Sequence, residues 1–269
     1  GQSGGGEKIQ DLMNIPAADG LFHKGIIQSG ATKFTYSKAD GGPLVRAMLD
    51  YLGLRETEAE QLEILPYPRL VEAYKAVARA CYKKNGYLGC SPAVNGWSLG
   101  TPRETGFTEH ARTIPLMVGS VMGEFCFEAG VQNKYGLTEA ETMPLLEKKY
   151  GALAGKIAEL FKAAYPGKHL SDALYLDTYF RVPTRKLIRR LAEEGKAPVY
   201  AWRLTYDFPI DGGKVAWHCS DVPFAFHNTC RTPLFNVPGE TDRLEERICG
   251  AVVSLARYGD PNTGTLPAW

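Results

Sequence analysis

The sequence lacks an excess of charge of either sign. It has 31 Lys and Arg residues against 30 Asp and Glu residues, which gives a net charge of +1. Without a basic surplus, no broad electrostatic field attracts the phosphates of a nucleic acid or an anionic membrane surface. No apolar run approaches the roughly 18 residues of a membrane-spanning helix. The composition, 44% hydrophobic and 23% charged, is instead typical of a soluble globular protein.

Closely spaced cysteine pairs and Asn-x-Ser/Thr glycosylation sites are also lacking. Six cysteines in 269 residues do not imply a disulfide framework, which favours a reduced, cytoplasmic setting. Cys81 and Cys90 could close a short loop, and buried free thiols are the alternative. The first residues, GQSGGG, resemble neither a signal peptide nor an initiator methionine context. We therefore expect a missing N-terminal half of the same protein, and the localisation stays open.

Helical and strand patterns alternate along the chain. Two short apolar runs that end at glycine predict strands at residues 25–30 and 114–118, and an alternating pattern predicts one at 199–204. Apolar residues at helical spacing predict helices at residues 4–14, 43–52, 70–81, 171–194 and 244–255, and Thr138 with Glu141 forms a capping-box signature for one more. Pro183 should kink or divide the helical region in which it lies. This alternation predicts an α/β fold with a sheet covered by helices on both faces.

Residues 1–5, GQSGG, match G-x-S-x-G, the nucleophile elbow. In such a turn the serine has strained dihedral angles, and the glycines let a strand and a helix approach closely. The hydroxyl of Ser3 would lie at a helix N-terminus, where free N–H groups favour negative charge. Glycine-rich turns that contain serine are common, so this pattern alone is weak. A phosphate-binding loop is the competing interpretation, but no hydroxyl residue follows Lys8 to bind magnesium.

Two further segments carry candidate catalytic groups. Glu124 follows the apolar strand pattern, and His218 precedes the run Asp-Val-Pro-Phe-Ala-Phe. Taken singly, each has a plain structural explanation, because a glutamate at a strand end is usually solvated and a lone histidine is usually packed. Glu128 is a rival for the acid and His227 a rival for the base.

The segments together resemble the type-B carboxylesterase/lipase family. Its G-E-S-A-G-G, G-L-F-H/R and Q-S-G motifs match residues 1–6, 20–23 and 28–30, with Gln2 for glutamate and Gly4 for alanine. Its G-x-N-x-x-E-G and H-G-x-E-L-P-F motifs match residues 119–125 and 218–224. Here the departures are Val121, Phe125, Cys219 and Asp221, which stand where the family has asparagine, glycine, glycine and glutamate.

The resemblance implies a role for each matching residue. Ser3 would be the nucleophile, Glu124 the triad acid and His218 the general base, and their order along the chain is that of α/β hydrolases. The N–H of Gly4 would be one oxyanion donor. Ser29 and Asp221 would form a buried supporting network, in which the short Asp side chain puts the contact in question.

The implied fold is a partial α/β-hydrolase fold, with a mostly parallel sheet and with its N-terminal strands missing. Residues 1–269 would be the C-terminal part of one such domain, with a helical, cap-like insertion at about 130–195. The implied function is hydrolysis of small-molecule carboxylic esters through an acyl-enzyme, without metal or organic cofactor. We expect the isolated chain to be poorly stable and weakly active. The alternatives are a catalytically inactive, cholinesterase-like binding module and an unrelated α/β protein with accidental matches.

Overall fold

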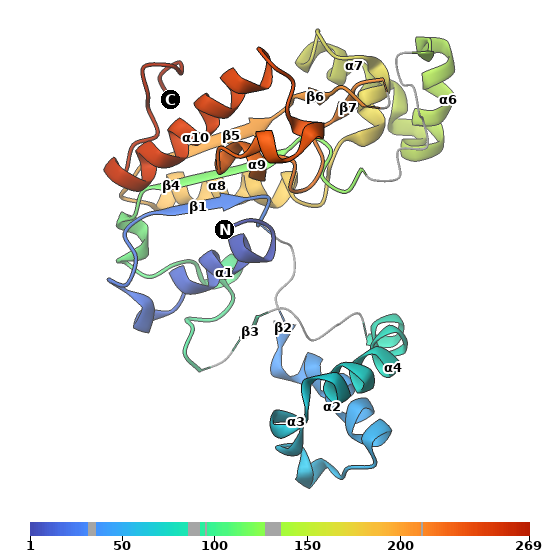
Figure 1. Ribbon diagram of the computed structural model, residues 1–269, viewed down its shortest axis with the longest axis vertical. Coiled ribbons are helices and arrows are strands. Elements are labelled where there is room, and N and C mark those ends of the chain that lie inside the picture. Colours follow the sequence, from blue (N-terminus) through green and yellow to red (C-terminus); the bar gives the residue numbers. More distant parts are fainter. Residues whose placement is uncertain (32–35, 86–91, 95, 127–135, 211) are drawn as a thin grey trace. The chain divides into compact units, whose positions relative to one another are not determined.

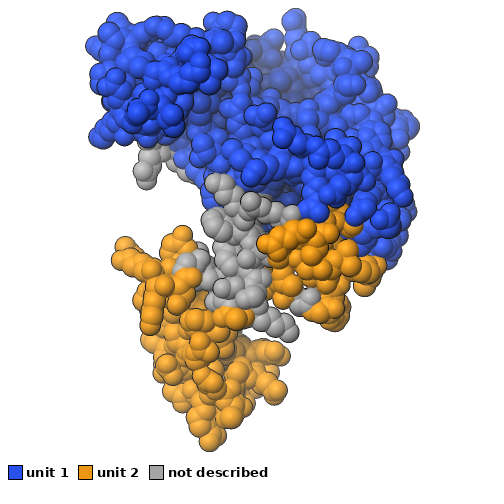
Figure 2. Space-filling view, turned by 180° about the vertical axis from the view of Figure 1, so that it is seen from behind, with its two compact units in different colours: residues 1–13, 18–33, 108–269 blue, residues 14–17, 34–107 orange. Residues whose placement is uncertain are grey.

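The structure is a computed structural model that describes residues 1–31, 36–85, 92–94, 96–126, 136–210 and 212–269. The chain divides into two units (Figure 2). Unit 1 comprises Gly1–Met13, Ala18–Lys33 and Thr108–Trp269, and unit 2 comprises Asn14–Ala17 and Phe34–Phe107. All six residues with a predicted role in the site belong to unit 1. The assignment of the chain to a single domain with an insertion at about 130–195 stays a prediction.

Unit 1 is built on a parallel sheet in the order β1-β4-β5 (Figure 1). Its strands are β1 (Gly25–Gln28), β4 (Leu116–Val121) and β5 (Val199–Leu204). Every residue of the central strand β4 is buried, as expected of a parallel strand between helical layers. The three predicted strands are confirmed. β4 begins after Pro115, which has no N–H to donate to a neighbouring strand, and it continues to Val121.

Helices cover both faces of this sheet. Unit 1 contains α1 (Gly4–Met13), α6 (Glu139–Tyr150), α7 (Ala154–Ala164), α8 (Arg181–Glu194), α9 (Val222–Ala225) and α10 (Thr241–Tyr258). α10 packs Leu255 against Met117 and Ile26, whereas α1 lies against Ile27 through Gly6. Since neighbouring strand residues point to opposite faces, α1 and α10 cover opposite sides of the sheet. The predicted α/β fold is therefore confirmed.

The helix boundaries agree with most of the expected signals. Thr138 and Glu141 form both hydrogen bonds of the capping box that opens α6, and Gly259, at a φ of 76°, ends α10. The helical region around Pro183 is divided, since a 3₁₀ helix spans Leu170–Tyr175 and α8 starts at Arg181 with the proline in its first turn. α7 and the antiparallel pair β6 (Asp207–Phe208) and β7 (Lys214–Val215) were not predicted.

Unit 2 is mainly helical. Its elements are β2 (Tyr36–Ser37), α2 (Lys38–Leu52), α3 (Gln61–Ile64), α4 (Tyr67–Asn85), β3 (Ala93–Val94) and α5 (Pro102–Thr105). β2 and β3 form a short parallel pair. α2 and α4 bury a small core of Leu44, Met48, Ala73 and Ala78. The helices predicted at residues 43–52 and 70–81 are confirmed and extend beyond those bounds.

Two expectations from composition concern the whole chain. Within the described residues, no helix combines the length and the hydrophobicity that crossing a bilayer requires. Five cysteines, Cys81, Cys126, Cys219, Cys230 and Cys249, carry free thiols. Cys90 lies outside the described residues, so the loop between Cys81 and Cys90 stays a prediction.

Candidate active site

The candidate nucleophile lies at the carboxyl end of β1. Gln2 forms a parallel bridge with Gln28, the last residue of that strand, and the N–H of Ser3 donates to the Gln28 carbonyl at 2.9 Å. Helix α1 begins at the next residue, Gly4. Ser3 has a φ of 54°, in the left-handed region that side chains other than glycine rarely occupy. The local geometry is therefore the strained strand-to-helix turn that the glycine-rich pattern predicts.

A contact between two glycines holds this turn against β1. A Cβ atom on Gly6 would lie 2.8 Å from the Cα of Gly30, and one on Gly30 would lie 2.5 Å from the Cα of Gly6. Both distances are too short for any side chain, and the opposing atoms belong to the backbone. Glycine is therefore required on both sides where α1 crosses the end of the strand.

The other two candidate groups are joined by backbone pairing. Glu124 follows β4 and forms a parallel bridge with Trp217, the residue before His218. The N–H of Gly123 donates to the Ala216 carbonyl at 2.8 Å, and the N–H of His218 donates to the Glu124 carbonyl at 2.8 Å. These bonds fix the histidine loop against the end of β4. Ser3, Glu124 and His218 thus meet at the carboxyl edge of the parallel sheet, where α/β folds bind ligands.

The three side chains form one hydrogen-bonded chain. The Nε2 atom of His218 lies 2.9 Å from the Ser3 Oγ, and Nδ1 lies 2.7 Å from Oε2 of Glu124. The carboxylate accepts the proton of Nδ1, so Nε2 is the ring nitrogen with a lone pair directed at the serine hydroxyl. Glu124 is fully buried and only 8% of His218 is exposed. The predicted contact between these three residues is therefore present.

Glu124 also has two further donors. Its Oε1 atom accepts the Ser29 hydroxyl at 2.6 Å and the Val121 N–H at 3.0 Å. With His218 on the other oxygen, the buried carboxylate has three hydrogen-bond donors. Such bonds offset the cost of burying a charge and hold the carboxylate in one orientation.

Backbone strain is concentrated at this edge of the sheet. Among the described residues, five other than glycine have a positive φ, and four of them belong to or adjoin the site: Ser3 (54°), Ser29 (46°), Glu124 (45°) and Cys219 (72°). Cys219 takes the place of a glycine in the family motif, and its φ gives the physical reason why glycine is suited there. Strained residues of this kind mark functional sites when the surrounding structure holds them.

Three side chains without a predicted contact surround the imidazole. The Phe180 ring stacks on it at a centroid distance of 5.0 Å and an interplanar angle of 10°, and the Phe125 ring lies at 4.7 Å. The amide nitrogen of Gln2 lies 3.3 Å from Nε2. Phe180 directly precedes α8, far away in sequence, and no local sequence signal connects it with the histidine.

The predicted supporting residues are both present, but they have different partners. Ser29 donates to Glu124, whereas Asp221 accepts from the Gln28 side chain at 2.9 Å. Ser29 and Asp221 are fully buried. The side chain of Gln28, which is longer than that of Ser29, thus donates to the short Asp221 side chain. The sequence did not predict this role of Gln28, because the supporting network was assigned to the serine of the motif and not to its glutamine.

Asp221 is poorly satisfied for a buried carboxyl group. Burial raises its pKa from 3.8 to about 6, and the hydrogen bonds from its own backbone N–H and from Gln28 oppose this shift only in part. Within the described residues, its Oδ1 atom has no hydrogen-bond partner. Asp221 is therefore partly protonated near pH 6, in contrast to an ordinary aspartate.

The rival acid and base have different positions. Glu128 lies outside the described residues. His227 is largely exposed, and its Nδ1 atom lies 3.8 Å from the Glu245 carboxylate. Of the two histidines, His218 is therefore the one in contact with the serine hydroxyl.

A parallel β-sheet between helices, with a serine elbow, an acid and a histidine together at its carboxyl edge, is the arrangement of an α/β hydrolase. The sequence model of the carboxylesterase family matches residues 1–269. The chain therefore belongs to the carboxylesterase family.

Individual relatives agree with this assignment. The chain is 29% identical over 272 residues to the para-nitrobenzyl esterase of Bacillus subtilis, a match that covers 98% of the chain and 53% of that protein. It is 26% identical to the phenmedipham hydrolase of Pseudarthrobacter oxydans, over 100% of the chain and 55% of that protein. The solved structure of an esterase from Clostridium hathewayi, described as able to hydrolyse aliphatic aromatic polyesters, has 43% identity and a TM-score of 0.89.

The chain spans about half the length of these relatives. It covers 54% of the Clostridium hathewayi esterase while all of the chain is matched.

Proposed function

We propose that this chain supplies the catalytic triad of a carboxylic ester hydrolase. Ser3 is the nucleophile, His218 the general base and Glu124 the acid that orients the imidazole. The observation that supports this proposal is the hydrogen-bonded chain itself, with 2.9 Å between Ser3 Oγ and His218 Nε2 and 2.7 Å between His218 Nδ1 and Glu124 Oε2.

The first half of the reaction forms an acyl-enzyme. The Ser3 Oγ attacks the ester carbonyl carbon while its proton moves to Nε2 of His218, and the carbonyl oxygen becomes an oxyanion. The tetrahedral species then breaks the bond between carbon and the alcohol oxygen. The departing oxygen takes the proton from Nε2, so an alcohol leaves and the acyl group stays on Ser3. The charged imidazole formed on the way is stabilised by the Glu124 carboxylate.

The second half of the reaction releases the acid. Water attacks the acyl carbon and gives a proton to Nε2 of His218. The bond between carbon and Ser3 Oγ then breaks, and the serine oxygen recovers the proton from Nε2. The carboxylic acid leaves, and the hydroxyl, imidazole and carboxylate return to their starting forms.

The oxyanion requires hydrogen-bond donors. We assign one to the N–H of Gly4, which opens α1, because the first N–H groups of a helix have no intrahelical acceptor and the helix dipole favours negative charge there. The other donors come from a segment outside these 269 residues, as in other α/β hydrolases. This proposal accords with the lengths of the relatives, which are about twice that of the chain.

A labelled fluorophosphonate tests the nucleophile directly, because it reacts with an activated serine. In the full-length protein that contains this chain, we expect labelling and hydrolysis of a short-chain aryl ester, and we expect both to be lost in Ser3→Ala. Ser254→Ala is the matched control, since Ser254 lies on α10 and its hydroxyl donates to the backbone carbonyls of Asp260 and Asn262. A protein that folds but neither reacts with the probe nor hydrolyses any ester would instead be a binding module.

The isolated chain is expected to hydrolyse esters more slowly than the whole protein. We propose that purified residues 1–269 are weakly active, because part of the oxyanion hole is contributed from elsewhere. Robust ester hydrolysis by the purified 269-residue chain, lost in Ser3→Ala, would contradict this part of the proposal and leave the triad intact.

A further inference from the structure

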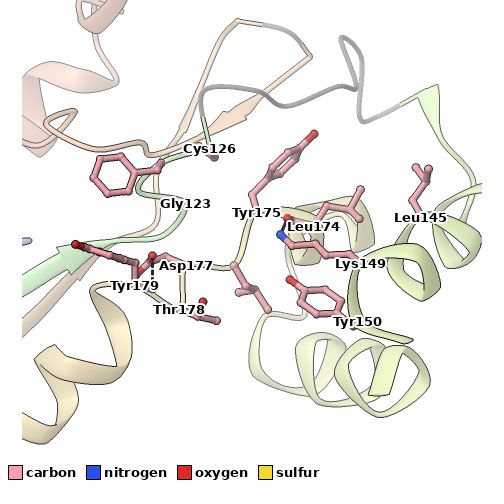
Figure 3. A pocket seen from close by; sticks show the side chains of 12 residues that line it. Gly123, Cys126, Leu145, Lys149, Tyr150, Leu174, Tyr175, Asp177, Thr178 and Tyr179 are labelled. Atoms are coloured by element: carbon pink, nitrogen blue, oxygen red, sulfur yellow. Dashed lines mark hydrogen bonds between the residues drawn. The ribbon is translucent and has the colours of Figure 1, made fainter. Parts of the chain in front are cut away.

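A pocket adjoins the loop that carries Glu124. It has a volume of about 510 Å³ and is lined by Gly123 and Phe125, the two neighbours of that glutamate (Figure 3). The Phe125 ring lies 4.7 Å from the His218 ring and 5.7 Å from the Tyr179 ring, which also lines the pocket. One wall of the pocket is thus continuous with the aromatic surroundings of the proposed base.

The opposite wall carries a cation. Lys149 lies in the last turn of α6, and its ammonium donates to the carbonyl of Leu174, while the neighbouring Tyr150 hydroxyl donates to the carbonyl of Ala173 at 2.7 Å. In Figure 3 the Lys149 side chain extends toward Leu174 and Tyr175. These bonds hold the end of α6 against the segment at residues 173–175. A carbonyl satisfies one N–H of the ammonium, but it does not neutralise the charge.

The pocket offers no acidic partner for this charge among its described lining residues. Asp177 also lines it, but its buried carboxylate accepts from three backbone N–H groups, those of Tyr179, Phe180 and Arg181, at 2.7 to 2.8 Å. The Asp177 carboxylate therefore satisfies the backbone N–H groups at the start of α8. Within the described residues, Lys149 forms no ion pair with a carboxylate. Partial burial of the ammonium lowers the pKa of Lys149, and the nearby Cys126 thiol opposes this shift only in part.

The geometry points to a carboxylate as the group that fits this end of the pocket. We propose that the pocket holds the distal part of an ester substrate and that Lys149 pairs with a carboxylate there. The substrate class is a half-ester of a dicarboxylic acid, or an ester with an acidic alcohol portion, whose apolar body lies along Phe125, Leu174 and Tyr179. The inference rests on the proposed ester hydrolysis and adds the kind of ester that is preferred.

Matched ester pairs test this preference. Half-esters of linear dicarboxylic acids of increasing length are compared with the same esters in which the free carboxylate is a carboxamide. A second series carries the carboxylate on the alcohol portion. In the full-length protein, kcat/KM should favour the anionic member of at least one pair, and Lys149→Met should reduce that preference by roughly three- to tenfold. The effect is modest because much of the Lys149 side chain is exposed, although its ammonium is partly buried, so that water screens the pair.

Two control variants separate charge from structure. Lys149→Arg keeps the charge and should keep the preference. Lys148→Met removes a lysine from the same helical turn, and Lys148 does not line the pocket, so the preference should be unchanged. Loss of the preference in Lys148→Met to the same extent, or an unchanged preference in Lys149→Met, would overturn the inference.

A binding measurement distinguishes failure of the inference from failure of the proposed function. The monoamide of a linear dicarboxylic acid carries the carboxylate but no ester, and calorimetry measures its Kd for the Ser3→Ala protein without turnover. We expect the additional change Lys149→Met to weaken binding by roughly three- to tenfold. An equal Kd for both proteins would contradict the carboxylate site. Intact binding without hydrolysis of any ester by wild type would contradict the proposed function instead.

Discussion

Two buried carboxyl groups lie at the same edge of the sheet and have very different surroundings. Glu124 receives three hydrogen bonds, from His218, Ser29 and the N–H of Val121. Asp221 is equally buried, but its Oδ2 accepts from Gln28 while its Oδ1 has no partner among the described residues. The two acids therefore differ in the number of hydrogen-bond donors and not in the depth of burial.

Removing the charge of the well-satisfied acid should have the largest effect. Glu124→Gln keeps the shape of the side chain but no longer stabilises a charged imidazole, and its amide can donate to Nδ1 and disfavour the required tautomer. We expect kcat to fall by roughly a thousandfold or more. Steady-state hydrolysis of an aryl ester measures this, with Asp221→Asn as the control, for which we expect less than about a tenfold change. Equal losses in the two variants would contradict the distinction between the acids.

Removing the charge of the poorly satisfied acid should affect stability instead. Because the pKa of Asp221 is about 6 in the folded state and 3.8 ordinarily, folding favours its protonated form, and stability is lost as the pH rises from 3.8 to about 6. Asp221→Asn removes this loss. At about pH 8 the variant should gain up to about 3 kcal/mol in free energy of unfolding, and at about pH 3 the two proteins should be similar.

Urea unfolding at the two pH values measures this difference. In Asp221→Asn the amide oxygen of the new side chain can still accept from Gln28, so the existing hydrogen bond persists in the variant. A variant that is less stable than wild type at about pH 8 would show that the aspartate charge is held favourably after all.

Two buried serines differ in hydrogen bonding in the same way as the two acids. Ser29 donates to Glu124, whereas the hydroxyl of Ser220, which is also fully buried, has no partner among the described residues. Ser29→Ala should lower kcat/KM by about tenfold, since a hydrogen bond to a charged group contributes roughly 1.5 kcal/mol or more. Ser220→Ala should leave activity unchanged. Similar kinetics for the two variants would mean that the bond from Ser29 does not position the acid.

The smallest effect is expected at Cys219. This residue has a φ of 72°, and Cys219→Gly should relieve the backbone strain and raise the free energy of unfolding by about 1 kcal/mol, less the entropy that glycine adds to the unfolded chain. Cys219→Ala removes the thiol but keeps the strain, so it should give no such gain. Thermal or urea unfolding of both variants measures the difference, and a gain in the alanine variant would assign the effect to the thiol.

The sequence predicted β1 and β4 because each is a short apolar run, and β5 because its residues alternate; β4 in particular is buried along its whole length. It did not predict β6 and β7, two residues each, because so short a pair depends on its tertiary surroundings for stability. The meeting of Ser3, Glu124 and His218 was predictable from the family motifs and from the order of the three residues along the chain. The stacking of Phe180 on His218 was not, because it joins segments that only the folded chain brings together.

The supporting network shows the same limit in more detail. The motif identified Ser29 and Asp221 as buried polar residues, and burial is correct for both. Their partners depend on side-chain length, since Gln28 reaches the shorter aspartate and Ser29 bonds Glu124. A motif indicates which residues are near one another, but the donor that reaches each acceptor is decided by distances of about one bond length.

The contact between Gly6 and Gly30 has a consequence for how this protein can evolve. Because backbone meets backbone there, a side chain added at either position would push α1 away from the end of β1. Such a shift would move the serine hydroxyl, since Ser3 lies directly before the first residue of α1. At these two positions sequence drift is therefore limited to glycine, while the residues that line the neighbouring pocket stay free to diversify.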